Sequence, residues 1–215
     1  GGGGGQKLLA AGVEVEPGVC KELALPSLAP WLHVQEKHLP YVRLKFAVTK
    51  DGFIAREDGS SKWISNEESR RAVHVLRAQS DAVLIGTKTA IVDTPSLDAR
   101  LDGVLKQPLA FAMGLTDISQ TSSHIKMIQT RDPHEALNVL MQAGVHSVLL
   151  EGGTALAQSF LDAGVVNEIW QFEGDAVFGS GIPAPEFSSS EWKVQKQQRF
   201  GNDALTVYAP SNASG

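Results

Sequence analysis

Residues 42–49 read Val-Arg-Leu-Lys-Phe-Ala-Val-Thr, and this stretch decides how the rest of the chain is interpreted. Its apolar residues occupy every second position, which is the period of a β-strand with one buried face. Lys45, Ala47 and Thr49 must therefore point to the opposite face. A lysine between small residues suits a cleft in which a ligand lies against the sheet, and a solvated face is an equal alternative. A desolvated lysine could donate a proton or polarise a carbonyl or imine.

Segments of strand and helix character alternate after this strand. Apolar runs bounded by turn residues predict strands at 82–85, 109–113, 125–129, 147–150 and 168–172. Helical spacing predicts helices at 66–79, 132–143 and 154–163, the first opened by a capping box of Ser65 and Glu68. Two last strands, at 192–198 and 204–208, predict a hairpin. The fold class is therefore α/β, with a mostly parallel central sheet, flanking helices and a C-terminal antiparallel hairpin.

The first part of the chain differs from the rest. Five glycines predict a flexible start, and Pro17, Gly18, Pro26 and Pro30 are expected to break the next segment into pieces too short for a core. We therefore expect residues 1–39 to be a linker or the remnant of another domain, and residues 40–215 to form the main domain.

Composition narrows the classes of function. The chain has 215 residues, 42% of them hydrophobic, and its 19 Lys and Arg against 24 Asp and Glu disfavour a nucleic-acid platform. No run of about 18 apolar residues predicts a membrane span. Cys20 is the single cysteine, so an intrachain disulfide or a Cys-rich zinc site is excluded and a reducing, cytoplasmic compartment is expected. His33 and His38 are five residues apart, which is not the spacing of a helical zinc pair, and no metal is expected.

Two further features suggest ligand binding. Glu151-Gly152-Gly153-Thr154 lies between a predicted strand and a helix, where glycines let a phosphate approach free amides of the helix. A plain strand-to-helix turn is the alternative. Arg70, His74 and Arg77 share one face of the first predicted helix. This stripe is either solvated surface or, if Arg100 folds nearby, part of a phosphate site in which two guanidiniums hold one phosphate.

Five segments, taken in order, resemble one family. They are residues 41–52, 61–65, 76–82, 93–97 with Arg100, and 151–153. Together they are similar to the reductase domain of the bifunctional riboflavin-biosynthesis deaminase/reductase, whose fold is that of dihydrofolate reductase. The resemblance covers residues 40–208, and residues 8–15 resemble the end of the family's preceding deaminase domain.

The resemblance implies an activity and a set of site residues. NADPH would give hydride to C1′ of 5-amino-6-(5-phosphoribosylamino)uracil and yield the ribitylamino product. Lys45 and Glu151 would be catalytic, and Glu151 would also contact the substrate. The other substrate residues would be Ser61, Arg77, Leu97 and Arg100. The residues holding NADPH would be Ala47, Trp63, Thr89, Asp93, Gly152, Gly153, Thr154, Ala155 and Leu156. The resemblance also suggests a homodimer.

Several positions depart from the family pattern, among them Thr49, Lys50 and Thr94, where Ser, Leu and Asp are usual. Gly114 and Leu115 stand where an Asp and a Ser often lie near the cofactor, and Asn167 replaces a usual Asp. Two other functions therefore stay open. One is a reductase of the same fold that acts on a pterin or another small carbonyl compound, and the other is a binding module that has lost catalysis.

Overall fold

A computed structural model describes residues 3–62 and 64–211, and it is built around one eight-stranded sheet. The strand order is β5-β4-β3-β6-β1-β7-β10-β9. From β5 to β7 all neighbours are parallel, whereas β10 is antiparallel to β7 and to β9. The strands are β1 (Tyr41–Val48), β3 (Ala82–Gly86), β4 (Leu109–Met113), β5 (Lys126–Ile128), β6 (Ser147–Leu150), β7 (Glu168–Glu173), β9 (Trp192–Phe200) and β10 (Asp203–Pro210). The predicted fold class and terminal hairpin are confirmed.

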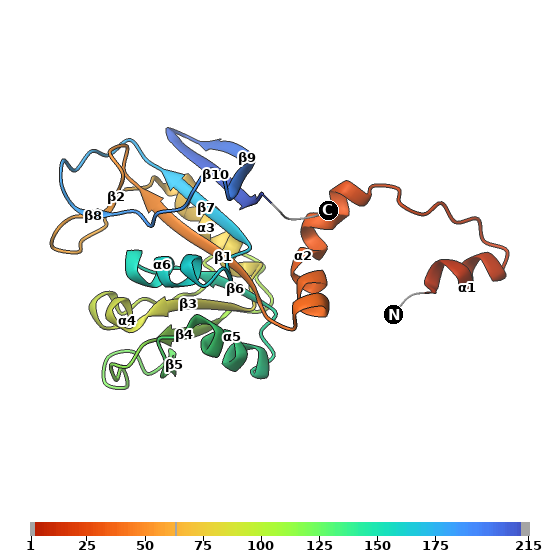
Figure 1. Cartoon of the computed structure of the whole chain (residues 1–215), viewed down its shortest axis with the longest axis horizontal. Coiled ribbons are helices and arrows are strands. Elements are labelled where there is room, and N and C mark those ends of the chain that lie inside the picture. Colours follow the sequence, from red (N-terminus) through yellow and green to blue (C-terminus); the bar gives the residue numbers. More distant parts are fainter. Residues whose placement is uncertain (1–2, 63, 212–215) are drawn as a thin grey trace.

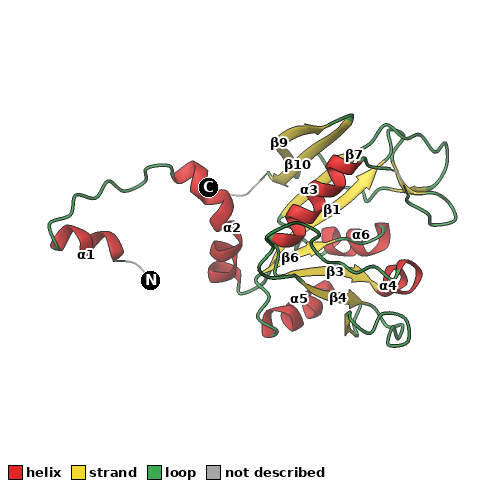
Figure 2. Cartoon of the chain, turned by 180° about the vertical axis from the view of Figure 1, so that it is seen from behind, coloured by secondary structure: helices red, strands yellow, loops and turns green. Residues whose placement is uncertain are grey.

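Helices cover both faces of the sheet (Figures 1 and 2). On one face, α5 (Pro133–Gln142) and α6 (Thr154–Asp162) pack against the even-numbered residues of β1, with Leu137 and Phe160 fully buried. On the other face, α3 (Glu67–Ala78) packs Val73 and Leu76 against β3, β6 and β7. Because both faces are covered, β3 and β6 are continuous apolar runs, as buried parallel strands usually are, whereas β1 alternates. Lys45 lies on the α3 face.

The start of α3 is held by residues from two places in the chain. Asn66 is the N-cap, and its Oδ1 accepts from the amide of Ser69 at 2.9 Å. Asp203, at the start of β10, accepts from the Asn66 amide at 2.8 Å and from the Ser69 hydroxyl at 2.6 Å. The predicted capping box on Ser65 is therefore wrong by one residue, because the buried Asp203 carboxylate fixes which residue begins the helix.

The N-terminal part forms an arm in which α2 lies beside the sheet and α1 stands away from it (Figure 1). It contains α1 (Gly4–Ala10) and α2 (Lys21–Lys37), and α2 runs through Pro26 and Pro30. The predicted break at Pro26 and Pro30 is wrong, whereas Pro17 and Gly18 do lie in the turn between α1 and α2. The first two glycines of the predicted flexible start lie outside the described residues. Since α2 is largely exposed, water can satisfy the carbonyls that the prolines leave unpaired.

Three short elements have no counterpart in the prediction. α4 (Thr87–Asp93) follows β3 directly, and β2 (Phe53–Ala55) pairs with β8 (Ile182–Pro183) in a separate two-stranded ribbon. Among the described residues, no helix has the length and apolar character needed to cross a bilayer. The ribbon and α4 both lie beyond the carboxyl ends of β1 and β3, which places them around the candidate site.

Candidate functional site

A largely buried cluster of three charged side chains lies between α3 and the sheet. β1 pairs with β6 through Leu44 and Leu150, so Lys45 and Glu151 are the next residues along two neighbouring parallel strands. Arg77 reaches the same place from α3 and forms two bonds with Glu151, Nε to Oε1 at 2.7 Å and Nη2 to Oε2 at 2.9 Å. The side chains of Arg77 and Glu151 are only 15% and 13% exposed. The structure thus brings three of the predicted site residues together.

Electrostatics in this cluster favour the ionised form of Glu151 and disfavour the ionised form of Lys45. Burial lowers the pKa of Lys45, the Glu151 charge acts to raise it, and the Arg77 charge lowers it further. Burial alone would raise the pKa of Glu151, but the hydrogen bonds and charge of Arg77, with Lys45, bring it below the usual value. Glu151 therefore stays anionic beside Lys45. A lysine whose pKa is lowered in this way can give up a proton more readily than an exposed one.

Residues 94–100 form a loop, the 94–100 loop, which borders the cluster. Arg77 Nη1 donates to the backbone carbonyl of Asp98 at 3.2 Å, and Arg100 Nε lies 3.2 Å from the Asp98 carboxylate. Leu97 is buried in this loop with a left-handed φ of 56°. The predicted pair Arg77 and Arg100 thus meets at Asp98. Arg77 is also held by Glu151, however, whereas the Arg100 side chain is 65% exposed.

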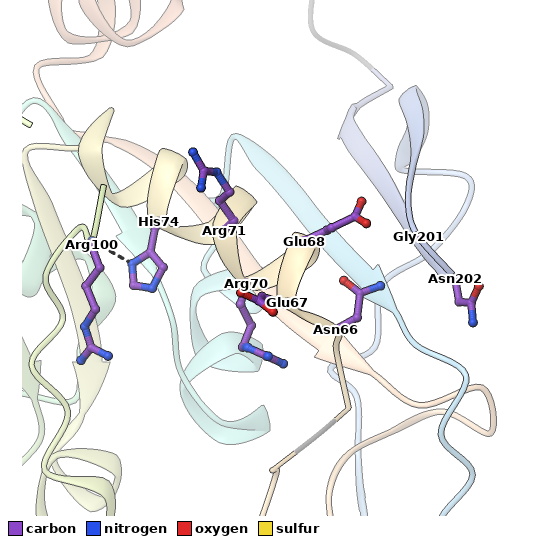
Figure 3. A pocket seen from close by; sticks show the side chains of 9 residues that line it. All are labelled: Asn66, Glu67, Glu68, Arg70, Arg71, His74, Arg100, Gly201 and Asn202. Carbon is purple, nitrogen blue, oxygen red and sulfur yellow. Dashed lines mark hydrogen bonds between the residues drawn. The ribbon is translucent and has the colours of Figure 1, made fainter. Parts of the chain in front are cut away.

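A surface hollow of about 870 Å³ runs along α3 from this loop to the turn between β9 and β10. Figure 3 shows Arg100 and His74 at one end of it and Asn202 at the other. Its lining residues are Asn66, Glu67, Glu68, Arg70, Arg71, His74, Arg100, Gly201 and Asn202. The predicted stripe contributes Arg70 and His74, whereas Asn202 was missed because only folding brings the hairpin turn to the helix. Asn66 and Arg71 were also missed, although Asn66 caps α3 and Arg71 lies in it, so helical spacing could have found them.

A glycine turn at the start of α6 suits a phosphate group. Gly153 is the N-cap of α6 and provides no side-chain cap, so the first amides of the helix keep the donors that a phosphate would accept from. A Cβ on Gly153 would meet no atom within 4 Å, so backbone can be approached closely there. Because β3 and β6 are neighbours, this turn and the start of α4 at Gly86 lie at the same carboxyl edge of the sheet. Nucleotides usually bind α/β sheets at that edge.

The other residues predicted to bind the cofactor or the substrate lie in several separate elements. Ala47 packs on the α3 face of β1, Thr89 and Asp93 lie in α4, and Ser61 is exposed in the loop after β2. Ala155 and Leu156 lie in the first turn of α6. Trp63 lies outside the described residues.

Two departures from the family pattern have a structural account. Gly114 has a φ of 151°, and a Cβ there would lie 2.4 Å from Thr87 Oγ1, so a side chain would collide with the start of α4. Asn167 Oδ1 accepts from the Val42 amide at 2.7 Å, and its Nδ2 lies 3.3 Å from His33 Nδ1. Asn167 therefore holds the start of β1 and faces α2.

A parallel sheet with a buried charged cluster and a glycine turn at its carboxyl edge defines the class of ligand-binding α/β domains. The family model described as the RibD C-terminal domain matches residues 40–206. The chain belongs to the RibD C-terminal domain family.

Curated relatives agree with this assignment. The riboflavin biosynthesis protein RibD of Mycobacterium tuberculosis H37Rv is 38% identical over 221 residues, which cover 95% of this chain and 65% of the relative. RibD of Corynebacterium ammoniagenes is 38% identical over 190 residues, which cover 84% of this chain and 56% of the relative. The chain thus spans less than two thirds of the length of these relatives.

Solved structures agree on the fold. A diaminohydroxyphosphoribosylaminopyrimidine deaminase/5-amino-6-(5-phosphoribosylamino)uracil reductase from Thermotoga maritima matches with a TM-score of 0.84 and 26% identity, over 97% of this chain and 67% of that one. Dihydrofolate reductase from Enterococcus faecalis, complexed with NADP(H), matches with a TM-score of 0.59 and 12% identity, over 80% of this chain and 97% of that one. The second likeness concerns the fold alone, and it confirms the predicted dihydrofolate-reductase-like architecture.

Proposed function

We propose that this chain is an NADPH-dependent 5-amino-6-(5-phosphoribosylamino)uracil reductase of riboflavin biosynthesis. The observation that carries the proposal is the buried Lys45 beside the ionised Glu151, which is fixed by Arg77. The family assignment and the reductase named in the Thermotoga maritima structure supply the substrate. The same domain would take a nicotinamide cofactor, and we infer NADPH in particular.

The reaction adds one hydride and one proton to the substrate. NADPH supplies the hydride to C1′ when it is bound. The ribose ring has to open at the bond between C1′ and the ring oxygen, and the leaving oxygen then needs a proton. Lys45 donates that proton and recovers one from solvent. Glu151 keeps Lys45 protonated before the step and holds the substrate, while Arg77 fixes the Glu151 carboxylate.

The remaining residues bind and orient. Arg100, with Leu97 and Ser61, lines the substrate beside Arg77, and the exposed guanidinium of Arg100 suits the substrate phosphate. The glycine turn of residues 152–156, with Ala47, Trp63, Thr89 and Asp93, holds the cofactor. Residues 1–39 are a linker or the remnant of a preceding deaminase domain, and the domain of residues 40–215 acts as a homodimer in the cytoplasm.

The test measures NADPH oxidation with 5-amino-6-(5-phosphoribosylamino)uracil. We expect wild-type protein to turn over this substrate and not dihydrofolate. Lys45→Met should lower kcat by about 100-fold or more, because general acid catalysis contributes about that much. Lys196→Met, on the exposed strand β9, is the matched control and should keep full activity. Lack of turnover by folded wild-type protein, or full activity of Lys45→Met, would refute the proposal. Turnover of dihydrofolate alone would instead favour a pterin reductase.

A further inference from the structure

His74 contacts the backbone of the 94–100 loop at two places. Its Nδ1 lies 3.1 Å from the amide nitrogen of Arg100 and 3.2 Å from the carbonyl oxygen of Asp98. His74 projects from α3, one turn before Arg77, and lines the hollow together with Arg100 (Figure 3). The contact thus joins the helix that carries Arg77 to the backbone of the other arginine of the proposed site.

A single ring nitrogen cannot serve both partners in the same way. When the Arg100 amide donates, Nδ1 must carry its lone pair, so the proton of a neutral ring is on Nε2. A ring protonated at Nδ1 would donate to the Asp98 carbonyl and leave the Arg100 amide without this acceptor. The Asp98 carbonyl already accepts from Arg77 Nη1 at 3.2 Å. With the ring proton on Nε2, His74 Nδ1 therefore accepts from the Arg100 amide, while Arg77 Nη1 satisfies the Asp98 carbonyl.

The surroundings of His74 favour the neutral ring. Burial, the Arg77 charge and the Arg100 charge lower its pKa, and this outweighs the opposing effect of Asp98. Arg70 and Arg71 are the other cations that line the same hollow, and Glu67 and Glu68 are its carboxylates.

The 94–100 loop needs external support. Thr94 and Leu97 have φ values of 40° and 56°, a region in which side chains are unfavourable, so the surroundings must hold the loop in place. Gln107 holds Ala99 through bonds of 2.7 and 3.1 Å, and His124 lies 2.9 Å from the Pro95 carbonyl. His74 holds the next residue, Arg100, whose guanidinium turns back to Ser96 and Asp98.

We propose that His74 is a positioning residue for substrate binding: its Nδ1 accepts from the Arg100 amide and thereby fixes where Arg100 and Leu97 meet the phosphorylated sugar. This inference rests on the proposed function. It assigns to His74 no contact with the reacting atoms.

Two substitutions separate the acceptor from the bulk of the ring. His74→Leu keeps an apolar side chain but removes the acceptor, whereas His74→Asn places Oδ1 where Nδ1 was. His134→Leu, on the exposed face of α5, is the matched control. We expect His74→Leu to raise the KM for 5-amino-6-(5-phosphoribosylamino)uracil by about five- to tenfold, which is the effect of one hydrogen bond. The kcat and the NADPH affinity should stay within about twofold, and His74→Asn should restore most of the KM.

Hydrogen exchange of the Arg100 amide tests the same bond without turnover. Exchange should be faster in His74→Leu than in wild type, and His74→Asn should restore protection. An unchanged KM in His74→Leu, or an Asn variant as impaired as the Leu variant, would overturn the inference. If wild-type protein does not turn over the substrate, the proposed function fails, and exchange at Arg100 still decides whether His74 holds the loop.

Discussion

Arg77 and Glu151 meet as a fork, with Nε 2.7 Å from Oε1 and Nη2 2.9 Å from Oε2. Two parallel bonds of this kind fix the direction of a carboxylate as well as its charge. The pair joins α3 to the end of β6, beside Lys45 on the neighbouring strand. The geometry of the proposed proton donor is therefore set by a contact between a helix and the sheet.

Glu151→Gln should change the pH dependence of turnover. The Glu151 charge raises the pKa of Lys45, whereas burial and Arg77 lower it. Without that charge the pKa of Lys45 falls further, so Lys45 loses its proton at lower pH. Since the proposed reaction needs the protonated amine, the basic limb of the kcat/KM profile should move to lower pH. Glu67→Gln, at the exposed start of α3, should leave the profile unchanged. A basic limb in the same place for Glu151→Gln would show that Lys45 is not the titrating donor.

Lys45→Met should separate stability from activity. A buried cation is costly, and Met fills similar space without charge, while Glu151 keeps its fork to Arg77. At neutral pH we expect the free energy of unfolding to rise by about 1 kcal/mol, as often happens when a strained site is relieved. Urea unfolding, monitored by circular dichroism, measures this difference.

The advantage of Lys45→Met should shrink as the pH rises. The pKa of Lys45 is lower in the folded chain than its ordinary value of 10.5, so between the two values the unfolded wild-type chain binds more protons. Stability rises with pH wherever the unfolded state binds more protons, so the wild type gains on the variant in this window. If the difference in unfolding free energy between Lys45→Met and the wild type grew toward about pH 10, the lowered pKa of Lys45 would be contradicted.

The sequence predicted most of the sheet because its strands are local patterns. Alternation in β1 and the unbroken apolar runs of β3 and β6 depend on neighbouring residues only, and the alternation placed Lys45 on the face opposite the apolar residues of β1. β2 and β8 have three and two residues, which is too short for periodicity to show. The predicted break at the prolines of α2 is wrong because the helix is exposed, so its interior prolines are tolerated. The sequence does not reveal that exposure.

The site was predicted in parts rather than as a whole. We expected Lys45, Arg77 and Glu151 at the site. The sequence pattern indicated Lys45 and the end of β6 as positions that could contact a ligand, and the family resemblance supplied the roles of the three residues. The fork between Arg77 and Glu151 joins residues 74 positions apart, and no local pattern specifies it. The His74 contact with Arg100 likewise depends on the path of the 94–100 loop, which has no periodic structure.

Gly174→Ala should be strongly destabilising. A Cβ at Gly174, just after β7, would lie 1.8 Å from the carbonyl oxygen of Ile64, and backbone cannot rotate away as a side chain can. We expect the free energy of unfolding to fall by about 3 kcal/mol, the upper end for overpacking in a well-filled interior. Gly153→Ala is the control, because its Cβ would meet no atom within 4 Å, and its stability should change by less than about 1 kcal/mol. Equal unfolding midpoints for the two variants would show that the loop before α3 can move aside.

Asp203→Asn should weaken the start of α3 and should do so through Ser69. Asp203 Oδ2 accepts from the Asn66 amide and the Ser69 hydroxyl, and the residue is only 3% exposed. The substitution removes a negative charge from the positive end of a helix and weakens two bonds, so we expect a loss of about 1 to 2 kcal/mol in the free energy of unfolding. Ser69→Ala should lose about 1 kcal/mol, because it leaves one lone pair of the carboxylate without its partner. Since both changes break the same bond, the double variant should lose less than the sum of the two single losses, by about 0.5 kcal/mol or more. A double-mutant cycle from urea unfolding measures this coupling. Strictly additive losses would mean that the Ser69 hydroxyl does not act through the Asp203 carboxylate, so this bond would not hold α3, and with it Arg77 and His74, against the hairpin.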